Sequence, residues 1–128
     1  MFKGVVIKES LEDQSVLDGL RIVSTEVEPV TPGHKTPWVN QWTLHAIEIP
    51  EEEAARVAEE LCGALDKAHN WYADFKNDTH HYIIFNDKVF YVDRSSKEQY
   101  DGATQYGILL GIPAYQVDFS PNIQKWER

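Results

Sequence analysis

Three residues that can exchange protons lie close together in the segment WYADFKNDTHHYIIFNDKVFYVDR, residues 71–94. They are an aspartate, a histidine and a tyrosine: Asp74, His80 and Tyr82. A carboxylate, an imidazole and a phenol within one patch can act as general acids and bases. This chemistry requires that the elements carrying the three side chains place them on one surface.

The segment predicts three consecutive antiparallel strands joined by two tight turns. The strands are expected over residues 71–76, 80–85 and 88–93, because each run is rich in aromatic and β-branched residues. Asn and Asp occupy the turns at 77–79 and 86–87. These residues tolerate the backbone conformations that short hairpin loops require.

Side chains alternate between the two faces of a strand, so the pairing across each turn decides which residues share a face. We expect Phe75 to pair with His81 across the first turn, and Phe85 with Lys88 across the second. This register assigns one face to the core, covered by helices: Trp71, Ala73, Phe75, His81, Ile83, Phe85, Phe90 and Val92. The other face then mixes apolar and titratable groups: Tyr72, Asp74, Lys76, His80, Tyr82, Ile84, Val89, Tyr91 and Asp93.

The mixed face has two interpretations. Antiparallel sheets commonly keep one face in water, where tyrosines and charged residues are simply solvated. Alternatively, the face binds a ligand, with tyrosines as an aromatic platform and polar side chains that orient the ligand. The candidate binding residues are Tyr72, Tyr82 and Tyr91 for the platform, and Asp74, Lys76 and His80 for orientation.

A long loop is expected at residues 28–40, EPVTPGHKTPWVN, because its prolines and glycine exclude regular structure. Loops of this length are uncommon in compact domains and are often functional. Trp38 either anchors this loop to the core or belongs to a lid over a pocket. It therefore joins the candidate binding residues.

The remaining pattern predicts one α+β domain covering residues 1–128. Both main helices are expected on the sheet face that holds Phe75, Ile83 and Phe90. The same order of elements also fits a ferredoxin-like core with additions. The further strands are expected over residues 2–8, 20–27 and 41–49, and the helices over 51–68 and 96–110, with Gly111 as the left-handed cap of the second helix.

Charge and composition exclude several classes of partner. The formal net charge is −9, and no cluster of Lys and Arg suits phosphate groups or an anionic membrane. We therefore expect neither nucleic acid nor membrane binding. No apolar run approaches the length of a membrane span, and the run in MFKGVVIKES is too short for a secretory signal. A cytoplasmic location is expected.

No cofactor or metal is expected. The histidines are scattered, and the neighbours His80 and His81 point to opposite faces of a strand. The chain contains neither a Cys-x-x-Cys nor a His-Glu-x-x-His motif, and its glycines do not form a phosphate-binding turn. Cys62, on the apolar side of the first helix, is expected to be a small buried hydrophobic residue.

Three blocks of the sequence together resemble a family of small bacterial and archaeal proteins of unknown function. They are TPWVNQWTLHAIEIP, WYADFKNDTHHYIIFNDKVFYVDR and YGILLGIPAYQVDFSP, which cover somewhat under half of the chain. The family core reads WYADFKND…HYIIF…KVFYVDR. The resemblance implies no activity, cofactor or site.

Three functional hypotheses follow. The first is a small non-catalytic module that binds a ligand or a protein through the face of Tyr72, Tyr82 and Tyr91. The second is an acid–base enzyme that uses Asp74, His80 and Tyr82. The third is a structural homo-oligomer, such as a homodimer, that buries the same aromatic face.

Overall fold

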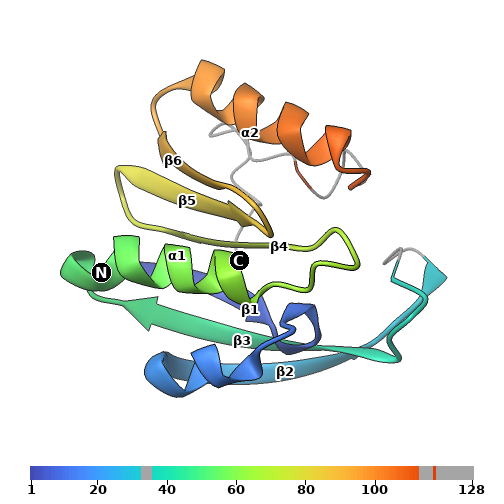
Figure 1. Cartoon of the computed structure of the whole chain (residues 1–128). Coiled ribbons are helices and arrows are strands. Elements are labelled where there is room, and N and C mark those ends of the chain that lie inside the picture. Colours follow the sequence, from blue (N-terminus) through green and yellow to red (C-terminus); the bar gives the residue numbers. More distant parts are fainter. Residues whose placement is uncertain (33–35, 113–116, 118–128) are drawn as a thin grey trace.

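The fold is built on one six-stranded sheet with two α-helices. A computed structural model describes residues 1–32, 36–112 and 117 (Figure 1). The strands follow the order β2-β3-β1-β4-β5-β6, and every neighbouring pair is antiparallel. The strands are β1 (Phe2–Ile7), β2 (Arg21–Pro29), β3 (Gln41–Ile49), β4 (Tyr72–Lys76), β5 (His80–Phe85) and β6 (Val89–Asp93); the helices are α1 (Ala54–Ala64) and α2 (Lys97–Leu109).

The α+β class and the mainly antiparallel sheet are confirmed. The helix predicted over residues 51–68 divides into a 3₁₀ turn, Glu51–Glu53, and the shorter α1, which ends where Leu65 becomes extended. Gly111 has a positive φ of 93°, as expected for its capping position. The ferredoxin-like alternative is not observed, because that arrangement requires a parallel strand pair and this sheet contains none among the described residues.

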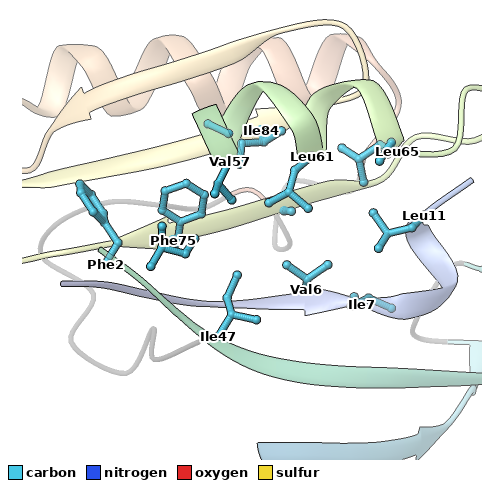
Figure 2. Packing of buried hydrophobic residues seen from close by; sticks show 14 of the residues in the cluster. Phe2, Val6, Ile7, Leu11, Ile47, Val57, Leu61, Leu65, Phe75 and Ile84 are labelled. Atoms are coloured by element: carbon cyan, nitrogen blue, oxygen red, sulfur yellow. The ribbon is translucent and has the colours of Figure 1, made fainter. Parts of the chain in front are cut away.

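The two helices lie on opposite faces of the sheet, which corrects the expectation that both cover one face. Val57 and Leu61 of α1 pack with Phe75 and Ile84, as Figure 2 shows. The second core cluster joins α2 to the neighbouring strand positions: Tyr72, Ile83, Phe85 and Val92 meet Tyr100 and Ala103. Adjacent residues of a strand point to opposite faces. We call the face with Phe75 and Ile84 the α1 face, and the face with Tyr72 and Ile83 the α2 face.

We call the three consecutive strands β4, β5 and β6 the meander. The loop of its first turn, between β4 and β5, is one residue shorter than expected. Lys76 pairs with His81, where the prediction paired Phe75 with His81. The reason is Asn77, whose side-chain oxygen accepts hydrogen bonds from the backbone amides of Thr79 (2.9 Å) and His80 (2.7 Å). These bonds stabilise a two-residue loop. The slip moves every side chain of β5 and β6 to the other face relative to β4.

The second turn follows the prediction. The amide of Phe85 donates to the carbonyl of Lys88 over 2.8 Å, and Ile84 pairs with Val89. The expected core set is therefore divided. Its β4 members, with Trp71 just before the strand, face α1, whereas its β5 and β6 members face α2.

Candidate functional site

The structure separates the six candidate residues of the meander into two groups of three. Tyr72, Asp74 and Lys76 lie on the α2 face, and the other three, His80, Tyr82 and Tyr91, lie on the α1 face. Tyr72 is 8% exposed and Asp74 is 2% exposed, so neither forms part of a surface. The predicted platform of three tyrosines on one face is therefore wrong, and Asp74 is not brought together with His80 and Tyr82.

The three residues on the α1 face, His80, Tyr82 and Tyr91, are connected by ring contacts, and we call them the aromatic surface. Tyr82 and Tyr91 are directly opposed in the register, with ring centroids 4.6 Å apart. The imidazole of His80 lies parallel to the ring of Tyr91, at 4.5 Å and an interplanar angle of 3°. Tyr91 is 55% exposed although it lies on a strand.

A row of paired residues connects this surface to the core. Phe75, Tyr82 and Tyr91 are successive partners across β4, β5 and β6. Phe75 is fully buried, Tyr82 is half-buried, and Tyr91 is exposed. Tyr91 belongs to β6, which is the edge strand of the sheet (Figure 1). Phe2 adds an edge-on contact to Tyr82 at 5.4 Å. Tyr82 is therefore packed on the core rings of Phe2 and Phe75, and Tyr91 is in turn packed against Tyr82.

The charges around the aromatic surface are well defined. Burial and the neighbouring Tyr91 raise the pKa of Tyr82, so its phenol stays neutral near pH 7. Hydrogen bonds from the side chain and backbone of Ser95 lower the pKa of Asp93, which pairs with His80 in the register. Asp93 is thus a carboxylate at the rim of the aromatic surface, near the neutral phenol of Tyr82.

The α2 face contains a buried polar network that the sequence analysis missed. His81 Nε2 lies 2.7 Å from Asp74 Oδ2, and His81 Nδ1 lies 3.1 Å from the hydroxyl of Tyr100. All three residues are 2% exposed. The network has the groups of an acid–base relay but lies outside the reach of a substrate, which favours a structural role. The sequence analysis assumed a three-residue turn, which puts His81 and Asp74 on opposite faces of the sheet. The observed two-residue turn at Asn77 puts them on the same face, so the correct register would have predicted this network.

Trp38 lies away from the aromatic surface. Its indole stacks on His69 with ring centroids 3.9 Å apart and meets Trp71 edge-on at 6.0 Å. Trp71 precedes β4, whereas the aromatic surface adjoins the other end of that strand. His69 is held in turn by Asp66, whose Oδ2 is 2.7 Å from its Nδ1. These contacts support the anchor interpretation of Trp38, which is still 42% exposed.

The residues that the structure describes also bear on metal binding, thiol chemistry and membrane insertion. Within it, no group of three or more His, Cys, Asp or Glu side chains is arranged to hold a metal ion. Cys62 is half-buried, against the expectation of full burial, and burial raises the pKa of its thiol. Neither described helix has the length and apolar character that a membrane span needs.

Comparison with known proteins returned no relative: no family model, no curated protein and no solved structure matches this chain. The resemblance of the three sequence blocks to a family therefore stays a prediction. The geometry of the aromatic surface is what bears on function.

Proposed function

We propose that this protein is a small non-catalytic binding module that recognises a protein partner through the aromatic surface of His80, Tyr82 and Tyr91. The observation that carries the proposal is the parallel stack of His80 on Tyr91, a residue that is 55% exposed on the edge strand β6. Rigid, exposed aromatic rings provide contact area at a low cost in conformational entropy, and they are enriched at protein interfaces.

The partner that suits this surface is a segment rich in Lys and Arg. A cation over the face of a tyrosine ring gains about 0.5–1 kcal/mol at an exposed site. Asp93 at the rim and the formal net charge of −9 add attraction for a basic segment. Binding is favoured over acid–base catalysis because Asp74 is separated from His80 and Tyr82 by the sheet.

The test is a nuclear magnetic resonance titration with a nine-residue peptide of alternating Arg and Gly, compared with its Glu–Gly counterpart. We expect the amide signals of Tyr91 and its strand neighbours to shift with the basic peptide alone. The Tyr91→Ser variant keeps the net charge, so purely electrostatic attraction survives in it while ring contacts are lost. We expect its affinity to fall about fivefold, which corresponds to about 1 kcal/mol.

A matched control replaces Leu109, which is 83% exposed on α2, with serine. This Leu109→Ser variant should bind the basic peptide as the natural chain does. Equal affinity for the natural chain and Tyr91→Ser, or signal shifts that map away from β5 and β6, would contradict the proposal.

The proposed location of the module is the cytoplasm. The free thiol of Cys62 is compatible with a reducing compartment, where disulfides are rare. Cell fractionation checks this part of the proposal, and recovery of the protein outside the cytoplasmic fraction would overturn it.

A further inference from the structure

The edge strand β2 is exposed along its whole length. All nine of its residues are exposed, and among the described residues β3 is the one strand with which it pairs. Three β-branched apolar residues of β2 are solvent-exposed: Ile22 at 38%, Val23 at 51% and Val27 at 57%. A long edge strand with exposed apolar residues is a ready template for another strand.

A β-bulge at Val23 inserts one extra residue into β2 and shifts its pairing with β3. Ile22 is opposite Ile47 on β3, and Ser24 is opposite Ala46, so Val23 has no partner of its own. Positions along β2 are therefore counted by their β3 partners. From Arg21, opposite Glu48, to Glu28, opposite Trp42, the strand spans seven paired positions with Thr25 at the centre.

We propose that β2 pairs with β2 of a second copy of this chain, antiparallel and across a two-fold axis at Thr25. Each paired position then meets a chemically suitable residue on the same sheet face. Arg21 lies opposite Glu28, Ile22 opposite Val27, Ser24 opposite Glu26, and Thr25 opposite Thr25, each time between the two copies. Because the axis repeats the first three pairs, the contact has two ion pairs and two apolar pairs.

Charge, strand coverage and the alternation of side chains together select this register over its neighbours. An axis at Glu26 would place two carboxylates directly opposite each other, which destabilises a strand pair. An axis at Ser24 would leave the C-terminal end of β2, from Val27 to Pro29, without partners in each copy. A shift by a single position would bring opposite faces together and is excluded by the alternation of side chains.

The proposed contact joins two six-stranded sheets edge to edge into one sheet. The aromatic surface is on β5 and β6, at the other end of the strand order (Figure 1). The dimer therefore leaves both copies of that surface accessible, so this inference is independent of the proposed function.

Disulfide trapping tests the register. In a Cys62→Ala background, Thr25→Cys places two thiols on the axis, where directly opposed Cα atoms are about 4.5–5.5 Å apart and within disulfide range. With copper phenanthroline as the oxidant, we expect Thr25→Cys to give a covalent dimer. Glu26→Cys alone should give little, because it faces Ser24, whereas a mixture of Ser24→Cys and Glu26→Cys chains should cross-link to each other.

Sedimentation equilibrium tests the charge pairing. Arg21→Glu turns both ion pairs into repulsive contacts, and we expect the dimer dissociation constant to rise about tenfold. Lys3→Glu is the matched control, because Lys3 and Arg21 both pair with Glu48, at 3.8 and 3.5 Å, but Lys3 is on β1. It should leave the dimer unchanged.

Three results would overturn the proposal. The first is a natural chain that stays monomeric over the whole concentration range. The second is a dimer that responds equally to Arg21→Glu and Lys3→Glu. The third is a dimer that Tyr91→Ser dissociates while Thr25→Cys fails to cross-link, which would place the contact on the aromatic surface.

Discussion

His81 Nε2 lies 2.7 Å from Asp74 Oδ2, and both side chains are 3% exposed. The other ring nitrogen, His81 Nδ1, lies 3.1 Å from the hydroxyl of Tyr100, so both nitrogens of the imidazole have a polar partner. Burial raises the pKa of Tyr100, which keeps that hydroxyl protonated. The network thus links strands β4 and β5 to helix α2 inside the second core cluster.

Removing the carboxylate should destabilise the fold. In Asp74→Ala the buried Nε2 of His81 loses its hydrogen-bond partner, and we expect the free energy of unfolding to fall by about 3 kcal/mol. Asp74→Asn keeps a carbonyl oxygen and should lose less. Urea unfolding measures both variants. Asp101→Ala, which breaks the exposed Lys97–Asp101 pair, is the control and should change stability by about 0.5 kcal/mol or less. Equal losses in Asp74→Ala and the control would argue against the network.

Two glycines should respond in opposite directions to the same substitution. At Gly4 in β1, a Cβ atom would overlap the carbonyl oxygen of Asp74 and approach Phe75 Cα to 2.6 Å. We expect Gly4→Ala to cost about 3 kcal/mol or more, because β1 and β4 would have to separate. Gly102 in α2 has open space around it, and Gly102→Ala should stabilise by about 0.5–1 kcal/mol. Thermal unfolding measures the stability of both variants. A Gly4→Ala variant as stable as the natural chain would show that β1 and β4 pair less closely.

Much of the fold could be predicted because local patterns state it directly. The three strands of the meander, the third strand at Gln41–Ile49 and the helix end at Gly111 appear where alternation, turn residues and capping predict them. These features depend on neighbours in the sequence.

The candidate site was predicted less well because it depends on one loop. A two-residue turn and a three-residue turn are both compatible with Asn77, Asp78 and Thr79, and the choice between them sets the face of every residue in β5. The side-chain bonds of Asn77 decide it. The placement of α2 on the other face follows from the same register, since Ile83 and Phe85 then need their own cover.

Stability should depend on pH through Glu9. Partial burial alone would raise its pKa, but hydrogen bonds from the hydroxyl and amide of Thr43 outweigh that effect and lower the pKa below the ordinary value near 4.5. The two bonds measure 2.7 and 2.5 Å and tie the residues after β1 to β3. Because the folded pKa is the lower one, the stabilisation is fully present above the unfolded value and is lost as the pH falls through the folded value.

The variant that tests this is Glu9→Gln, which keeps the size of the side chain but has no charge and only one acceptor oxygen in place of two. We expect it to be about 1 kcal/mol less stable than the natural chain near pH 6, and the difference to shrink as the pH falls below about 4.5. Thr43→Val removes one of the two bonds to Glu9 and should reduce the pH dependence only in part. Urea unfolding at a series of pH values measures all three chains. Parallel stability curves for the natural chain and Glu9→Gln would show that Glu9 titrates alike in the folded and unfolded states, and the Thr43 contact would then carry no charge-dependent stabilisation.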